Sequence, residues 1–181
     1  DFIQFPEGES CSPVDYGQAK VRVVVHEAEV GPETVEACEA YTDLKEALDA
    51  STSGDIVLVY PGEYAIDDCA QSAANENLSA LVVPAGVRLM STHGASETRL
   101  HLGEECTDFM QISDGATVEG FMFHGPSDVT GPQTRFVSLW GDDQTEMTET
   151  FRFNVLYGEQ IPYENAQPQN SWGIEVNSTS V

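Results

Sequence analysis

Two segments in the N-terminal part of the chain have hydrophobic patterns that predict regular structure. Residues 20–27 (KVRVVVHE) are rich in β-branched residues and predict a strand. Residues 42–50 (TDLKEALDA) predict a short amphipathic helix with Thr42 as its N-cap, because their apolar residues recur at the spacing of one helix face. Residues 1–50 are therefore predicted to form an N-terminal cap for the rest of the chain.

After residue 50 the pattern changes to short apolar segments that Gly, Pro, Asp and Asn separate. Their composition predicts strands at 56–60, 80–83, 87–91, 98–102, 109–113, 117–124, 135–140, 150–157 and 172–176. No convincing helical pattern lies between them, and tight hairpin signals such as Asn-Gly are absent. This argues against an up-and-down antiparallel arrangement.

Segments of similar texture recur along this region. One series begins at Ile56, Leu81, Phe109, Phe136 and Ile174, with spacings of 25, 28, 27 and 38 residues. A second series consists of the segments RLHLG, FMFHG and NVLYG, in which a strand ends at a glycine. Three short strands in each repeat of roughly 25–30 residues are typical of coiled parallel β-structure, where each coil buries its apolar side against the next.

The repeat pattern comes with a family resemblance. Residues 43–64 (DLKEALDASTSGDIVLVYPGEY) resemble the capping helix and first coil of the right-handed parallel β-helix proteins of the pectin-lyase-like superfamily. Residues 83–100 and 114–125 resemble segments of the coils that follow, so the resemblance covers roughly 42–158. It implies an all-β fold in which residues 51–181 form a right-handed parallel β-helix (a solenoid) of about four to five coils.

The superfamily includes polysaccharide lyases, glycoside hydrolases, pectin esterases, adhesins and tailspikes, so the fold alone assigns no activity. Its lyases typically need a Lys or Arg base, or acidic clusters that hold calcium, and this chain has no lysine after Lys45. No Asp–Asp–Arg set or spaced Asp pair aligns with the esterases or polygalacturonases. We therefore expect a non-catalytic extracellular or cell-surface module with a structural, self-assembling, adhesive or glycan-binding role. The alternative is the N-terminal part of a polysaccharide lyase or glycoside hydrolase that acts on acidic polysaccharide.

The charge balance excludes some of the other function classes. The chain has 31 Asp and Glu against 7 Lys and Arg, a formal net charge of -24. Such a field repels phosphate backbones, so we expect no nucleic-acid partner. No apolar run approaches the roughly 18–20 residues that a membrane span needs, so we expect no span either. Abundant surface carboxylates also fit a protein kept soluble in salty water.

The chain has four cysteines: Cys11, Cys38, Cys69 and Cys106. None belongs to a CxxC pair, which argues against a structural zinc site. An even number in an acidic chain predicts two disulfides and an oxidising, extracellular setting. Of the three pairings we prefer Cys11–Cys38 with Cys69–Cys106, and the alternative is four buried thiols.

The densest acidic cluster follows Trp140. It consists of Asp142, Asp143, Glu146 and Glu149. Carboxylates at short spacing on a loop are ligands for a hard cation, so a calcium site is one interpretation. The cluster lacks the regular alternation and central glycine of a known calcium loop, and a solvated acidic turn is the other interpretation.

Two residues at equivalent strand ends, His124 and Tyr157, are expected to lie above one another on adjacent coils. With Glu119 nearby, they predict a sugar-contacting or acid/base face. A stacked aromatic ladder without a ligand is the alternative. Trp140 is a second candidate platform for a sugar ring, whereas His101 shows no informative spacing and is interpreted as incidental.

The chain stops at Val181 as a new coil begins. We expect either that the coils continue beyond it or that another chain covers the open end. An open parallel edge is a template for strand pairing. The predicted partners are therefore further copies of this chain, in a homo-oligomer or filament formed by coil-end stacking.

Overall fold

The structure, a computed structural model, describes residues 20–25, 39–66, 70–71, 78–102, 108–125, 135–142, 148–157 and 174–179. Within these ranges nearly all regular structure is β-strand, and the single helix is α1 (Leu44–Asp49). The predicted all-β class is therefore confirmed.

The strands form three sheets, which we call A, B and C. Sheet A contains β2 (Glu39–Tyr41), β1 (Val21–Val24), β3 (Ile56–Val59), β7 (Arg88–Ser91), β10 (Thr117–Glu119) and β13 (Thr150–Arg152), in that order. Sheet B contains β4 (Gly62–Ile66), β8 (Thr98–Leu102), β11 (Met122–His124) and β14 (Val155–Tyr157). Sheet C contains β5 (Ala70–Gln71), β6 (Leu78–Val83), β9 (Asp108–Ser113), β12 (Arg135–Asp142) and β15 (Ile174–Thr179). Every strand pair is parallel except β5 with β6.

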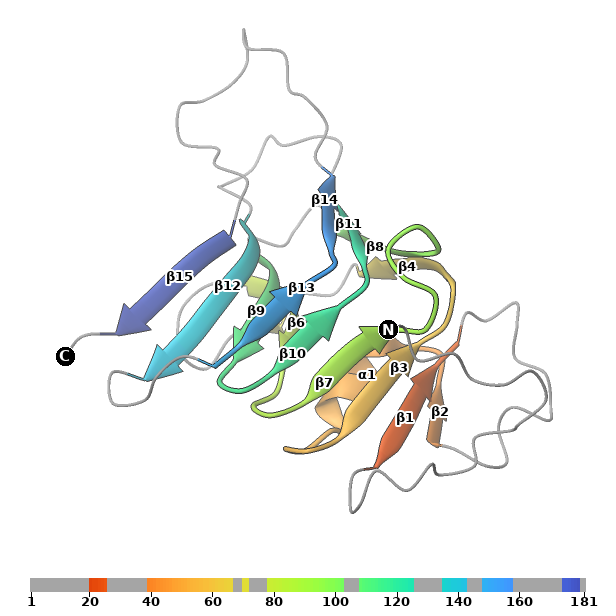
Figure 1. Cartoon of the computed structure of the whole chain (residues 1–181), viewed down its shortest axis with the longest axis horizontal. Coiled ribbons are helices and arrows are strands. Elements are labelled where there is room, and N and C mark those ends of the chain that lie inside the picture. Colours follow the sequence, from red (N-terminus) through yellow and green to blue (C-terminus); the bar gives the residue numbers. More distant parts are fainter. Residues whose placement is uncertain are drawn as a thin grey trace, which may run out of the picture.

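The chain visits the sheets in the order A, B, C, and in the described residues it does so four times. The turns are β3–β4–β6, β7–β8–β9, β10–β11–β12 and β13–β14–β15, which we call the first to fourth turns. Each strand pairs with its counterpart one turn later, as the progression of colours within each sheet in Figure 1 shows. This arrangement is compatible with a β-helix or another solenoid, and it differs from an antiparallel meander.

The predicted strand positions agree with the structure in most places. β8 has the expected bounds, whereas the segments expected as single strands at 117–124 and 150–157 each form two strands that belong to sheets A and B. β4 was not predicted, because only Tyr64 and Ile66 of its five residues are large, buried apolar side chains. The recurring series starting at Ile56 is misaligned, because Ile56 lies in sheet A and Leu81 in sheet C.

The helix lies at the end of the stack where the first strands are. The side chain of Asp43, not of Thr42 as predicted, caps it by accepting hydrogen bonds from the amides of Lys45 (2.7 Å) and Glu46 (3.3 Å). Its predicted apolar face is buried against strands β1, β2, β3 and β6. The helix thus covers apolar surface that the first turn would otherwise expose.

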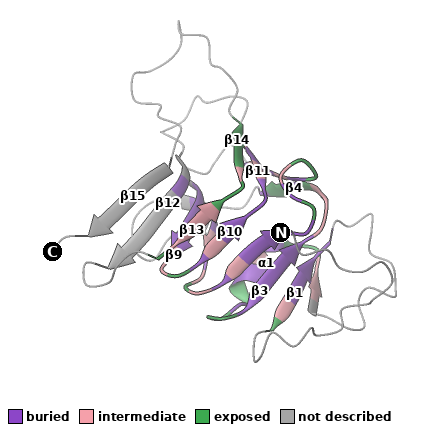
Figure 2. Ribbon diagram, viewed as in Figure 1, coloured by how far each residue is buried: buried purple, intermediate pink, exposed green. Residues whose placement is uncertain are grey.

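The core consists of inward side chains that repeat from turn to turn. One column from each sheet is Val57–Leu89–Val118, Tyr64–Leu100–Phe123 and Leu81–Met110–Val137. Phe123 contacts Phe109 edge-on, with ring centroids 5.1 Å apart. Figure 2 shows the buried positions over the middle of the stack and the exposed ones at β14. Burial of the apolar columns therefore stabilises stacked turns rather than single ones.

A buried ion pair ties β1 to the start of β3. The Arg22 guanidinium contacts the Asp55 carboxylate, and both side chains are nearly inaccessible to solvent. Asp55 also accepts hydrogen bonds from the amides of Lys20 (3.2 Å) and Thr52 (2.9 Å) and from the Thr52 hydroxyl (3.0 Å). Burial alone raises the pKa of Asp55, but the hydrogen bonds from Thr52, Arg22 and Lys20 outweigh it and lower the pKa from 3.8 to about 2.

All four cysteines lie outside the described residues, so the two disulfides stay a prediction. The part of the chain that the structure describes holds no helix long and apolar enough to cross a bilayer.

We expect Asp55→Asn to lower the free energy of unfolding at pH 7 by about 2 kcal/mol, because the variant loses the carboxylate that accepts these hydrogen bonds. The folded pKa lies below the unfolded value, so this contribution is complete above about pH 4 and is lost as the pH falls towards 2. The difference between parent and variant should therefore shrink over that range. Urea denaturation at several pH values measures it.

The matched control is Asp43→Asn, which also removes one carboxylate but keeps a good N-cap. We expect the control to stay within about 0.5 kcal/mol of the parent at pH 7. An equal loss in both variants would mean that total charge, and not the buried pair, sets the effect.

Candidate functional site

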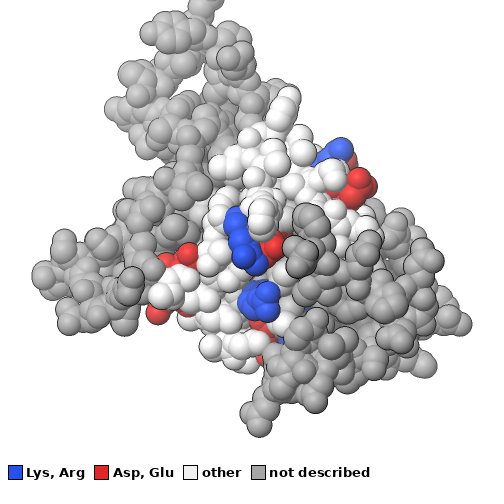
Figure 3. Space-filling view, viewed as in Figure 1, with Lys and Arg blue, Asp and Glu red and all other residues white. Residues whose placement is uncertain are grey.

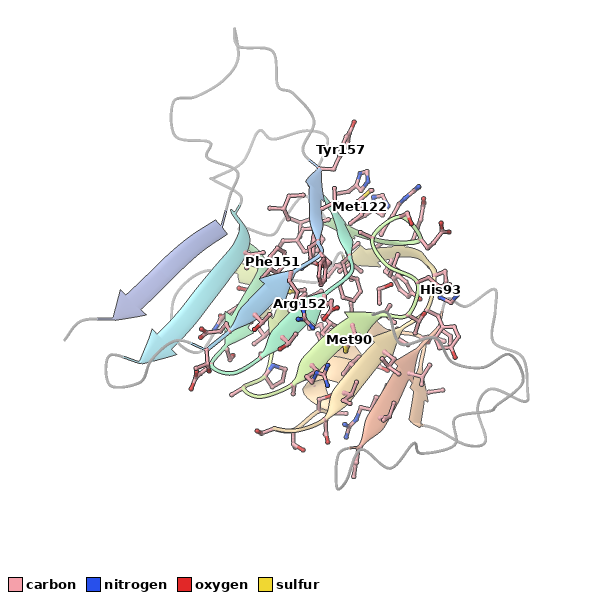
Figure 4. All side chains as sticks on the ribbon, in the orientation of Figure 1. Met90, His93, Met122, Phe151, Arg152 and Tyr157 are labelled. Carbon is pink, nitrogen blue, oxygen red and sulfur yellow. The ribbon has the colours of Figure 1, made fainter. Side chains whose placement is uncertain are left out.

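The outer surface of sheet B carries side chains of chemical interest. Strand alternation buries Leu100 and Phe123 in the core and turns Arg99, His101 and His124 to the other side. We call this surface the sheet-B face; it consists of Glu63, Ala65, Arg99, His101, Met122, His124, Val155 and Tyr157. Figure 4 shows Met122 on β11 and Tyr157 at the far end of β14, and the register places Val155 opposite Met122 and His124 opposite Tyr157.

The parallel register arranges these residues in two rows that run across the strands. One row is Glu63–Arg99–Met122–Val155, and the other is Ala65–His101–His124–Tyr157. Because the pairing is in register, each residue lies one strand spacing from its neighbour in the row, about 4.8 Å.

Three rings stack along the second row. The ring centroids of His101 and His124 are 4.8 Å apart, and those of His124 and Tyr157 are also 4.8 Å apart, with interplanar angles of 30° and 39°. The predicted stack of His124 on Tyr157 is confirmed. The interpretation of His101 as incidental is wrong, because the register places it opposite His124.

Polar groups lie beside the ring stack. Arg99 donates from Nη1 to Oε1 of Glu63 at 2.9 Å, and Nε2 of His101 lies 3.9 Å from Oε2 of the same carboxylate. The Arg99 and Glu63 side chains are 44% and 63% exposed, so this pair contributes at most about 1 kcal/mol. In the same row as Arg99 and Glu63, Sδ of Met122 lies 3.2 Å from Nε2 of His124.

The environment of His124 keeps its ring uncharged at neutral pH. Burial lowers its pKa below the ordinary 6.5, and the neighbouring His101 and Arg99 lower it further, whereas Glu63 acts in the opposite direction. At pH 7 the centre of the stack is therefore a neutral imidazole.

Glu119 does not belong to this face. It is the last residue of β10 in sheet A, where Nε of Arg152 donates to its Oε2 at 2.9 Å and Nη2 of Arg152 lies 2.8 Å from the same oxygen. Its predicted place beside His124 is wrong. The two residues are close in sequence, but β10 belongs to sheet A and β11 to sheet B. In Figure 3 the visible Lys and Arg atoms of the described residues lie next to Asp or Glu atoms.

The other predicted site residues lie mostly where the structure describes no side chain. Trp140 and Asp142 belong to β12, but the structure does not describe their side chains, and Asp143 and Glu146 lie outside the described residues. Glu149 is half-buried before β13. The described side chains contain no group of three or more His, Cys, Asp or Glu that is placed to hold a metal ion. The calcium site stays a prediction.

Comparison with known proteins adds no assignment: no family model, no curated protein and no solved structure matches the chain. A function for this chain is therefore inferred from the geometry of the sheet-B face.

We expect the imidazole of His124 to titrate below pH 6.5, and His101→Gln to raise its midpoint because one of the neighbouring groups that disfavour its proton is removed. The ring C–H signals, followed by NMR between pH 4 and 9, measure the midpoint. The control Arg88→Gln removes a charge from sheet A and should leave it unchanged. A midpoint above 6.5 in the parent would contradict the described environment.

Proposed function

We propose that the chain is a non-catalytic carbohydrate-binding module of the cell surface or extracellular space. In this proposal the fold is a right-handed parallel β-helix of the pectin-lyase-like kind. The repeated A–B–C order of parallel strands and the helix at the first turn support the fold. The acidic composition and the four cysteines support the location.

The observation that carries the function is the His101–His124–Tyr157 stack beside the Arg99–Glu63 pair. A sugar ring has an apolar C–H face and a rim of hydroxyl groups. Tyr157, at the exposed end of the stack, offers a ring face for the C–H face of the sugar, and the guanidinium and carboxylate offer donors and acceptors for the hydroxyls. Tyr157 is 52% exposed, so its ring is accessible without any rearrangement.

The same face supports binding better than hydrolysis. Glycoside hydrolysis usually needs two carboxyl groups on either side of the scissile bond. Among the eight residues of the sheet-B face, Glu63 alone has a carboxyl group, and Arg99 already occupies one of its oxygens. Catalysis by residues elsewhere in the chain remains the alternative, and release of unsaturated or reducing-end products from pectate or alginate would establish it.

We expect Tyr157→Ala to weaken polysaccharide binding by about tenfold, because the exposed end of the ring stack is lost. Affinity electrophoresis in gels that contain pectate, alginate, arabinoxylan, glucomannan or mixed-linkage β-glucan measures the retardation. Tyr157→Phe keeps the ring and is the matched control. Equal retardation of the parent and Tyr157→Ala in every gel would show that the sheet-B face does not bind these polysaccharides through Tyr157.

A second proposed function is self-assembly by stacking of the fourth turn. Among the described strands, β13, β14 and β15 are the outermost of their sheets at this end of the stack. The amide of Val155 donates to Phe121 and the carbonyl of Tyr157 accepts from Gly125, so by alternation the polar backbone groups of Leu156 point to the opposite edge of β14. That edge is a template for a strand of another copy.

We expect Leu156→Pro to abolish any such assembly, since proline has no amide to donate at this edge while the bonds of Val155 and Tyr157 to the third turn persist. Leu156→Ala keeps the amide and is the control. Because two chains of charge -24 repel one another, the assembly should strengthen between 0.05 and 0.5 M salt. Sedimentation velocity measures it, and a monomeric parent in 0.5 M salt would contradict stacking between copies.

A further inference from the structure

The corner between sheets A and B differs between the third and fourth turns. The register places Arg152 opposite Glu119 and Val155 opposite Met122, so Phe153 occupies the position of Gly120 and Asn154 that of Phe121. Gly120 has a φ of 85°, in the left-handed region where glycine is unstrained. Phe153 has a φ of 56° at the same corner, a conformation that costs free energy for a residue with a side chain.

The strained residue displays its ring instead of burying it. Phe153 is 66% exposed, whereas Phe121 in the preceding turn is fully buried. Asn154 turns towards the third turn, where its Oδ1 accepts from the amide of Phe121 at 2.8 Å and its Nδ2 donates to the carbonyl of Val118 at 3.0 Å. The fourth turn therefore has a polar residue where the third has a core phenylalanine, and an aromatic ring where the third has no side chain.

The exposed ring lies at the corner between β13 of sheet A and β14 of the sheet-B face. Phe153, Val155 and Tyr157 are at alternate positions, with exposed fractions of 66%, 43% and 52%. Met122 lies beside Val155, and His124 beside Tyr157. The guanidinium carbon of Arg152 lies 5.5 Å from the centroid of the Phe153 ring. We call the series of exposed apolar residues from Phe153 at the corner to Tyr157 on β14 the apolar strip.

The charges beside this strip determine which class of ligand fits. Arg99 pairs with Glu63, and Arg152 with Glu119, so each cation next to the strip already faces a carboxylate. The whole chain has a charge of -24. An acidic polysaccharide would meet net repulsion without a dedicated cation, whereas an uncharged one would meet none.

We infer that Phe153 is a second sugar-contacting residue, and that the strip from Phe153 to Tyr157 binds the apolar faces of an uncharged glycan chain. The inference rests on the proposed carbohydrate-binding function and specifies its ligand class. The left-handed backbone at residue 153 is kept because it displays the ring, at a corner where glycine would be the unstrained choice.

The test uses the whole chain and the variants Phe153→Gly and Phe153→Asn, since both residues accept a left-handed backbone without the ring. Calorimetric titration with soluble arabinoxylan, glucomannan and mixed-linkage β-glucan measures the affinity, with pectate and alginate as acidic probes. We expect binding to at least one neutral polysaccharide, a loss of about tenfold in affinity in both variants, and retained affinity in Phe153→Tyr. The melting temperature of Phe153→Gly should be equal to or above that of the parent.

Several outcomes would overturn the inference. Neutral-glycan binding that depends on Tyr157 but is unchanged in Phe153→Gly would remove Phe153 from the site and leave the proposed function intact. Binding to pectate or alginate alone would overturn the ligand class and again leave the function intact. A dimer of the parent that Phe153→Gly dissociates would make the ring an interface residue. No binding to any of the five polysaccharides would overturn both proposals.

Discussion

In-register parallel pairing of strands from successive turns is the constraint on which the rest of the structure depends. Each turn buries its apolar side chains only against the turns above and below it, as the column Tyr64–Leu100–Phe123 shows. The same register fixes the outer surface, so the spacing of 4.8 Å between the stacked rings of His101, His124 and Tyr157 follows from the strand spacing. The same strand pairing therefore orders the core on the inner side of the sheets and the candidate site on the outer side.

Much of the architecture could be predicted from the sequence because each strand has a local signal. β-Branched runs and turn residues are short-range features, and they located most strands and the helix. Register is not short-range. Alignment of RLHLG with FMFHG on their final glycines places Leu102 opposite His124. The observed pairing of His124 with His101 differs from this by one residue. The alternation of buried and exposed residues along each strand gives the correct register. Leu102 faces the core, whereas His101 and His124 face outward, so His124 pairs with His101.

The candidate site was only partly predictable for a related reason. His124 and Tyr157 were found because both end a repeated segment. The Arg99–Glu63 pair joins residues 36 positions apart, and no local pattern contains it. Glu119 was wrongly included because the chain changes sheet at Gly120, which a sequence that reads as one continuous strand does not reveal. Contacts between residues of one turn therefore depend on where the chain changes sheet. Contacts between residues of successive turns depend on the strand register.

The fourth turn shows how stability and surface chemistry oppose one another in this fold. Burial would favour an apolar residue at position 154, and the left-handed backbone would favour glycine at 153, as in the third turn. The chain instead has Asn154, whose two hydrogen bonds satisfy backbone groups of the third turn, and Phe153, whose ring is left in water. Such a turn gains less free energy from burial and depends on the turns before it for its order. At β13 and β14, whose side chains are described, this low burial coincides with exposed rings, so a ligand that covers Phe153 and Tyr157 would stabilise these two strands.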